Sequence, residues 1–189
     1  MAALPKSLFV LVLSGVLMKE YILETKRCYV REMKESDVAD EIKLYESPHM
    51  TDYIEPPEDY EEEVKLCAEY ARKVYGRFGY GMWGIFDKEN DRLIGEAGLE
   101  PRFDVDRSAY PYDWMFEDNC AELGFFIAEQ LWGRGYCTEV CSQVLTYCRE
   151  HFGISDVFAR AEDGNVASVR VLEKLGFTKI DDCLYRLVN

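Results

Sequence analysis

A mixed α/β fold in a single domain is predicted for this sequence. Strand-like and helix-like patterns alternate along the chain, which is typical of a mixed α/β domain. Its 189 residues match the length of one domain, and 48% of them are hydrophobic, which is enough to build a core. Neither an internal repeat nor an interdomain linker is visible. We therefore assign residues 18–189 to one folded domain.

Residues 1–17 are interpreted as an N-terminal extension. They contain a ten-residue apolar run, Leu8 to Leu17, which is too short to span a bilayer. The run is similar to the apolar core of a signal peptide, but no small-residue cleavage motif follows it. We favour an added strand, or an extension upstream of a second start at Met18, over an export signal.

The first half of the chain predicts one strand, two helices and a hairpin. Alternating apolar residues indicate the strand, and Ser36-Asp37 can cap the helix that follows it. The second helix carries apolar residues on one face, and a polar turn separates the two arms of the hairpin. The ranges are 28–33 for the strand, 59 or 60 to 75 for the second helix, and 80–87 and 92–99 for the hairpin.

The second half predicts strand, helix, strand, helix and strand. Residues 120–128 (CAELGFFIA) form a short apolar run that is typical of a buried central strand. The helix after it has the most regular pattern in the chain, and its three cysteines are interpreted as small core residues. Its buried stripe is Cys137, Val140, Cys141, Val144, Leu145, Cys148 and Phe152, and the later elements are 156–161, 165–175 and 183–188.

The formal net charge of −14 excludes some classes of partner. Nucleic acids and anionic membrane surfaces attract clustered Lys and Arg, and no such cluster is present. Residues 35–69 carry −11 and residues 100–122 carry −5, so the rest of the chain sums to +2. Cationic partners are compatible with this distribution.

The seven cysteines are an odd number and include no C-x-x-C pair, which predicts reduced thiols and a cytoplasmic location. A zinc site requires paired Cys or His at short spacing. His49 and His151 each stand alone, so no metal site is expected.

Chemistry is indicated by the turn QLWGRGY, residues 130–136, between the apolar strand and the regular helix. Glycines at a helix N-terminus expose N–H groups, and the helix dipole favours an anion there, so the turn predicts a phosphate or pyrophosphate cradle. No Gly-Lys-Ser/Thr follows, and Thr138 occupies the third glycine position of a dinucleotide fingerprint. A tight turn without a ligand is the alternative interpretation.

The turn and three further segments resemble the GNAT superfamily of acyl-CoA-dependent N-acetyltransferases. Its signature, Q/R-x-x-G-x-G/A, is present as Gln130, Gly133 and Gly135. The resemblance covers residues 21–188, looks like the Rim-type branch that acetylates ribosomal proteins, and implies a mixed, mostly antiparallel sheet with a splayed central strand and about four helices. The other segments are 23–31 with Ser36-Asp37, 121–125, and Asn165-x-x-Ser168 with 175–177.

The resemblance implies acetyl-CoA as the co-substrate and no metal. The splayed strand would pair with the pantetheine arm, and backbone N–H groups of the turn and first helical turn would hold the pyrophosphate. Asn165 would contact the pantetheine. The strand positions are Phe126, Ile127 and Ala128, and the pyrophosphate positions are Gly133, Arg134, Gly135, Tyr136 and Cys137.

Glu122 is the candidate general base, since a carboxylate within an apolar strand would have its pKa raised by desolvation. A salt-bridged Glu122 is the alternative. The family's usual acid, a tyrosine seven residues after the motif asparagine, is replaced by Leu172. Ser168 is therefore the candidate general acid, although a serine there also caps helices, and Tyr185 is a further candidate.

The predicted activity is transfer of an acetyl group to a primary amine by direct attack in a ternary complex. In the family, the segments equivalent to 55–63 and 104–118 border the acceptor side. Their acids and aromatic residues would favour a cationic small amine or a peptide N-terminus as acceptor. The alternative is that these segments form a solvated charged surface without a binding role. Two other functions compete with this one. The first is a GNAT-derived protein that binds CoA as a sensor or interaction partner, and the second is a nucleotide-binding domain. A homodimer is compatible with the resemblance.

Overall fold

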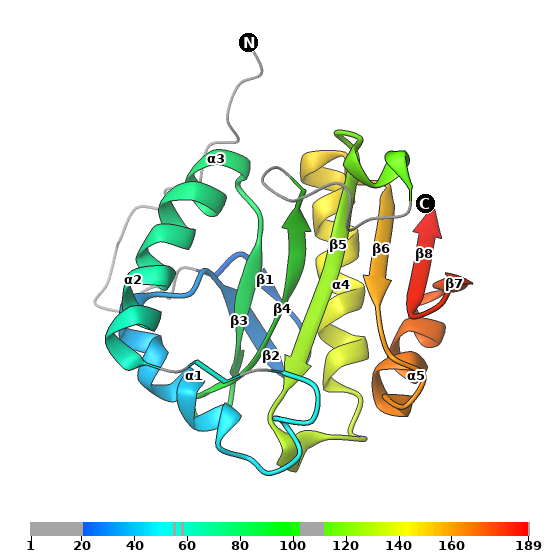
Figure 1. Cartoon of the computed structure of the whole chain (residues 1–189). Coiled ribbons are helices and arrows are strands. Elements are labelled where there is room, and N and C mark those ends of the chain that lie inside the picture. The colour runs from blue at the N-terminus through cyan, green and yellow to red at the C-terminus, as the bar shows by residue number, and fades with distance from the viewer. Residues whose placement is uncertain (1–20, 55, 58, 103–111, 189) are drawn as a thin grey trace.

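The computed structural model describes residues 21–188 except 55, 58 and 103–111. The extension predicted for residues 1–17 and most of the acidic segment 104–118 lie outside the described residues. Within them, one eight-stranded sheet runs in the order β1-β2-β3-β4-β5-β6-β8-β7. Every neighbouring pair is antiparallel except β5 and β6, which are parallel. The predicted mixed, mostly antiparallel α/β fold is confirmed (Figure 1).

The strands follow the predicted pattern closely, with boundaries that differ by at most two residues. Two short edge strands, β1 and β7, were not predicted, because neither is long enough to show alternation. The eight strands are β1 Leu23–Glu24, β2 Cys28–Arg31, β3 Met82–Asp87, β4 Leu93–Pro101, β5 Cys120–Ile127, β6 Asp156–Arg160, β7 Thr178–Asp181 and β8 Leu184–Val188.

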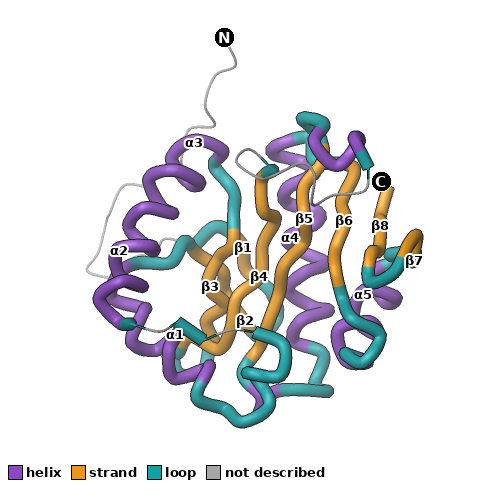
Figure 2. The backbone as a smooth tube through the Cα atoms, viewed as in Figure 1, coloured by secondary structure: helices purple, strands orange, loops and turns teal. Residues whose placement is uncertain are grey.

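The helices are also those predicted, as Figure 2 shows along the backbone. The second predicted helix is a continuous helical segment in which a π-turn, Ala71–Tyr75, joins α2 to α3. The α-helices are α1 Val38–Tyr45, α2 Tyr60–Tyr70, α3 Gly76–Phe78, α4 Tyr136–Phe152 and α5 Val166–Leu175. In the described part of the chain, no helix has the length and apolar character needed to cross a membrane.

The two faces of the sheet are covered by different helices. On one face, α4 buries Val140, Val144 and Cys148 completely, and the Trp83 ring of β3 meets the Tyr147 ring of α4 at 5.9 Å. The predicted stripe is buried along its middle, whereas Cys137 and Phe152 at its two ends are half-buried. On the other face, Tyr45 of α1 meets Phe126 of β5 at 5.5 Å. The sheet is therefore the middle layer between α4 and the α1–α2 pair.

The parallel pair β5 and β6 separates after three residue pairs. Cys120, Ala121 and Glu122 pair with residues of β6, whereas β5 continues to Ile127 alongside β4. Among the described residues, no strand pairs with Leu123 to Ile127 on the β6 side. The predicted splay of the central strand is present, and it leaves backbone groups of β5 open to another hydrogen-bonding partner.

Candidate active site

A glycine turn links the open end of β5 to the N-terminus of α4. Gly133 and Gly135 have φ values of 71° and 79°, in the left-handed region that favours glycine. A Cβ added to Gly133 would meet nothing within 4 Å, so the space beside it is open. Its backbone conformation would still be strained for any other residue. Gly135 is also the N-cap of α4, which has 17 residues. Open space, a helix N-terminus and free strand amides together fit the diphosphate and amide groups of an acyl-CoA.

The turn is held beneath the end of β5 by its own residues. The Trp132 indole donates to the carbonyl of Ile127 at 2.7 Å, and the Leu131 amide donates to Ala128 at 2.9 Å. Ile127 and Ala128, two of the predicted pantetheine residues, are buried, whereas Phe126 is half-buried. The predicted cofactor residues of β5 and of the turn therefore form one continuous segment.

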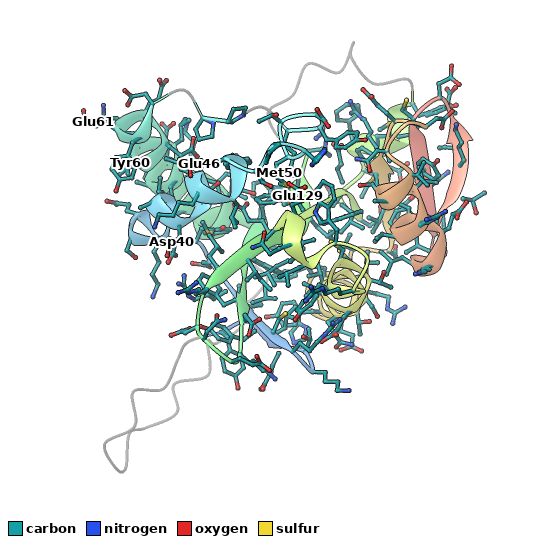
Figure 3. All side chains as sticks on the ribbon, turned by 90° about the horizontal axis from the view of Figure 1, so that it is seen from below. Asp40, Glu46, Met50, Tyr60, Glu61 and Glu129 are labelled. Carbon is teal, nitrogen blue, oxygen red and sulfur yellow. The ribbon has the colours of Figure 1, made fainter. Side chains whose placement is uncertain are left out.

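A second tie connects this turn to the segment after α1. The Glu129 carboxylate accepts hydrogen bonds from the Ser47 hydroxyl and from the His49 Nδ1, the latter at 2.6 Å. Hydrogen bonding to Glu129 raises the pKa of His49. Figure 3 shows Glu129 beside the segment that carries Met50, which is buried. The α1–α2 connection is thus attached to the cofactor side of the molecule.

Glu122 lies on the sheet face that α1 and α2 cover. Strand register pairs it directly with Glu100 on β4, so both side chains share that face. The Oε2 of Glu122 lies 2.7 Å from Arg102 Nη1, and its Oε1 lies 3.7 Å from Arg160 Nε. Glu122 is therefore ion-paired with both arginines. Of the two environments that the sequence analysis considered for Glu122, the structure shows the salt bridge and not an isolated carboxylate among apolar residues.

A buried carboxyl pair, Glu41 and Glu96, occupies the other end of the same face. Glu96 on β4 pairs in register with Phe126, and its Oε1 atom is enclosed without a hydrogen-bond donor among the described residues. Burial, followed by the charge of Glu41 and a hydrogen bond to it, raises the pKa of Glu96 well above its usual range. Burial also raises the pKa of Glu41. Two buried carboxyl groups that interact this closely disfavour double ionisation, so the raised pKa of Glu96 favours a shared proton on the pair.

Two aromatic hydroxyl groups border these acids. Tyr45 donates to Glu41 at 3.3 Å, and Tyr70 of α2 donates to Glu100 at 2.6 Å. Glu63 of α2 faces the same region, and burial followed by the charge of Glu41 raises its pKa. The sheet face thus combines carboxyl groups from α1, α2, β4 and β5 with two tyrosines.

The residues predicted at the start of α5 have structural partners. Asn165 is the N-cap of α5, and its side chain accepts the Ser168 amide at 3.0 Å. Within the described part of the chain, no hydrogen bond engages the Ser168 hydroxyl or the Asn165 amide nitrogen. Leu172, at the position of the family's tyrosine, is fully buried, and Tyr185 is 4% exposed on β8. Neither of these two side chains therefore lies at the surface.

All seven cysteines are free thiols. Burial raises the pKa of Cys137, at the start of α4, to about 12, so this thiol is not an activated nucleophile. The described residues contain no group of three or more His, Cys, Asp or Glu that could hold a metal ion.

Several residues of this region have no signal in the sequence. Arg27 donates to the carbonyl of Arg134 in the glycine turn, across 107 positions of the chain. Arg102 contacts Glu122 from beyond the end of β4. Glu96 did have a signal, since it is the one charged residue within the apolar run 93–99.

The described residues of 55–63 are exposed apart from Pro57 and Glu63, so this acidic run is largely solvated.

A sheet that splays beside a glycine turn at a helix N-terminus is the arrangement expected of an acyl-CoA-dependent N-acyltransferase. A family model described as Acetyltransferase (GNAT) domain matches residues 27–178, which is more than half of the chain. The chain therefore belongs to the GNAT acetyltransferase family. This family uses acetyl-CoA as its co-substrate.

Individual proteins agree with this assignment. The chain is 28% identical over 160 residues to the uncharacterized N-acetyltransferase YoaA of Bacillus subtilis (strain 168), covering 84% of this chain and 83% of that protein. Ribosomal-protein-S5-alanine acetyltransferase from Vibrio fischeri superposes with a TM-score of 0.70 at 16% identity, over 88% of this chain and 96% of that one. A spermidine N-acetyltransferase SpeG chimera gives 0.63 at 16% identity, over 86% and 94%. The two solved structures share the fold.

Proposed function

We propose that this protein transfers an acetyl group from acetyl-CoA to a primary amine of a cationic acceptor, by direct attack in a ternary complex. The observation that carries the proposal is the carboxyl-rich sheet face next to the splay of β5 from β6. Acetyl-CoA supplies an activated thioester carbonyl, and the protein's residues bind it, exclude alternative acceptors and move protons. The glycine turn and the open edge of β5 lie at one end of this arrangement, and the carboxyl groups line the covered face.

Binding of the co-substrate is assigned to the residues predicted from the sequence. Phe126, Ile127 and Ala128 would hold the pantetheine arm through the open edge of β5, with Asn165 on its other side. Backbone N–H groups of the turn and the first turn of α4 would hold the diphosphate. These latter positions are Gly133, Arg134, Gly135, Tyr136 and Cys137.

Glu122 remains the proposed general base, although it is ion-paired, because it is the last β5 residue paired with β6 and so lies where the two strands separate. Ser168 is the proposed general acid. Glu122 removes a proton from the acceptor ammonium, directly or through water, which frees the nitrogen lone pair for attack. The nitrogen bonds to the acetyl carbon while the carbon–sulfur bond breaks. Ser168 donates its hydroxyl proton to the departing thiolate and regains one, through water, from the acylated nitrogen, which loses its second proton as the neutral amide forms. Arg102 and Arg160 keep the Glu122 carboxylate in a fixed position through their ion pairs.

A cationic acceptor is favoured by the charges on this face. Glu63 and the Glu41–Glu96 pair, which keeps one negative charge when it holds a proton, converge there, and the groups that perturb their pKa values are further acids and Tyr45. Carboxylates attract an ammonium group, and the rings of Tyr45 and Tyr70 can bind it through cation–π contacts. The solved neighbours named for a ribosomal protein and for spermidine illustrate the two acceptor classes, a peptide N-terminus and a small polyamine.

An acceptor panel tests this proposal through release of free thiol from acetyl-CoA. The panel contains a polyamine, a basic peptide with a free N-terminus, a neutral peptide and an acidic peptide. We expect turnover with one of the cationic acceptors and little with the acidic peptide. Higher turnover with neutral or anionic amines would contradict a cationic acceptor.

A matched pair of variants on α2 sharpens the test. Glu63 faces the sheet and is half-buried, whereas Glu61 is exposed on the same helix. We expect Glu63→Gln to raise the KM for the cationic acceptor about 3- to 10-fold, as loss of one partly screened ion pair implies. Glu61→Gln is expected to leave this KM unchanged.

A CoA-binding sensor or interaction protein is the second candidate function, and buried Leu172 in place of the usual tyrosine acid favours it. This function predicts CoA binding without thiol release for every acceptor in the panel. The seven free thiols support a cytoplasmic location in either case.

A further inference from the structure

Arg27, in the turn between β1 and β2, reaches the glycine turn that precedes α4. Its Nη1 donates to the Arg134 carbonyl at 2.9 Å, and its Nε donates to the Glu139 carboxylate at 2.7 Å. The backbone amide of Arg27 also donates to Glu139 at 2.9 Å. The guanidinium carbon lies 3.8 Å from the centre of the Tyr136 ring. One side chain thus contacts the turn and the first helical turn at three points.

The contact with the Arg134 carbonyl determines which way the next amide points. A trans peptide is planar, and its C=O and N–H groups point in opposite directions. Because Arg27 binds the Arg134 oxygen, the N–H of Gly135 is directed away from Arg27. Among the described residues, this N–H donates no hydrogen bond within the protein. The peptide is therefore oriented with a free donor facing outward at the helix N-terminus.

The charge of Arg27 is already balanced within the protein. Burial alone would raise the pKa of Glu139, but hydrogen bonds from Thr25 and Arg27 lower it, so Glu139 is ionised. The Arg27–Glu139 ion pair contributes little net charge to a nearby anion. Any effect of Arg27 on an anion therefore acts through the orientation of the Arg134–Gly135 peptide.

We propose that Arg27 is a positioning residue for the diphosphate of acetyl-CoA, which it serves by holding the Arg134–Gly135 peptide so that the Gly135 N–H faces the phosphate. This inference rests on the proposed use of acetyl-CoA. A merely structural tie between the β1–β2 turn and α4 is the alternative. The two differ because positioning concerns the diphosphate alone, whereas a structural tie affects the whole protein.

The chain offers a matched control in Arg31. Arg31 makes two hydrogen bonds to Asp37, at 2.7 and 2.8 Å, and its guanidinium also lies 3.8 Å from an aromatic ring, that of Phe86. Arg27→Met and Arg31→Met thus remove the same kinds of contact. Only the first variant removes a contact with the glycine turn.

The experiment measures binding of CoA and of dephospho-CoA by calorimetry, together with kcat/KM for acetyl-CoA and for acetyl-pantetheine, which lacks every phosphate. We expect Arg27→Met to weaken binding of both CoA forms about 10-fold or more, as loss of one hydrogen bond to a charged group implies. Its kcat/KM with acetyl-pantetheine should equal that of the wild type. Arg31→Met should bind both CoA forms normally.

Arg27→Lys gives a second measurement if Arg27→Met folds poorly. A single ammonium cannot reproduce the guanidinium's simultaneous bonds to Glu139 and to the Arg134 carbonyl, so weaker CoA binding is again expected. Unchanged CoA binding, or equal losses with acetyl-CoA and acetyl-pantetheine, would overturn the positioning role. A wild-type protein that binds neither CoA form would refute the proposed function instead.

Discussion

Replacement of Glu96 by Gln should stabilise the protein at neutral pH and have no such effect in acid. Glu96 and Glu41 form a hydrogen-bonded carboxyl pair, and burial, followed by the charge of Glu41, raises the pKa of Glu96 well above its usual range. The unfolded chain exposes both carboxyl groups, with ordinary pKa values near about 4.3. Folding at neutral pH therefore requires the pair to take up a proton, which costs free energy.

Proton linkage gives the magnitude. Between about pH 5 and the raised pKa of Glu96, the native state holds roughly one more proton on this pair than the unfolded state. The free energy of unfolding of the wild type should then fall by about 1.4 kcal/mol per pH unit through this contribution. A glutamine at position 96 still donates to Glu41 and takes up no proton. The stability difference between Glu96→Gln and the wild type should therefore grow with pH at up to that slope.

Urea unfolding followed at several pH values from about 4.5 to 7.5 measures this difference. Shifts of other carboxyl groups are common to both proteins and cancel. Glu89→Gln, on the exposed turn between β3 and β4, is the control and should give a pH-independent difference. A pH-independent difference for Glu96→Gln, or one that shrinks as pH rises, would refute the proton-holding pair.

Three further variants test the site and the core. Glu122→Gln should lower kcat about 100-fold or more while the affinity for CoA stays within about 2-fold, measured by thiol release and calorimetry; an unchanged kcat would exclude Glu122 as the base. Leu172→Ala should lower the free energy of unfolding by about 2–5 kcal/mol in urea, since the side chain is fully buried, and a loss below about 1 kcal/mol would contradict that burial. Gly135→Ala should lower the free energy of unfolding by about 1–2 kcal/mol, because the φ of Gly135 is 79°, and it should weaken CoA binding. Gly164→Ala, at a position with open space around it, should change neither quantity. Equal effects of the two variants would contradict the requirement for a left-handed residue at position 135.

Much of the fold could be predicted because its signals are local. The stripe through Val140, Val144 and Cys148 repeats with the helical period, so its burial against the sheet follows from the sequence. Gly133 and Gly135 stand between an apolar strand and that helix, and both adopt the left-handed conformation that the cradle interpretation requires. The short edge strands β1 and β7 could not be predicted, since two and four residues show no reliable alternation.

The less predictable parts depend on contacts between distant segments. The pairing of Glu122 with Arg102 and Arg160 depends on which side chains the sheet register and the β6 end bring together, and no local pattern encodes that. The same holds for Arg27, whose partner carbonyl is 107 positions away. Glu96 could have been noticed as a lone charge in an apolar strand, but its pairing with Glu41 requires the packing of α1 on β4.

Hydrogen exchange with and without CoA locates the co-substrate through the backbone amides themselves. We expect slower exchange, on addition of CoA, in the peptides that cover Leu123 to Ile127 and Gly133 to Cys137. The α2 surface should show no change. Protection confined to other parts of the described chain, or no protection at saturating CoA, would contradict the assignment of the co-substrate to the β5 edge and the glycine turn.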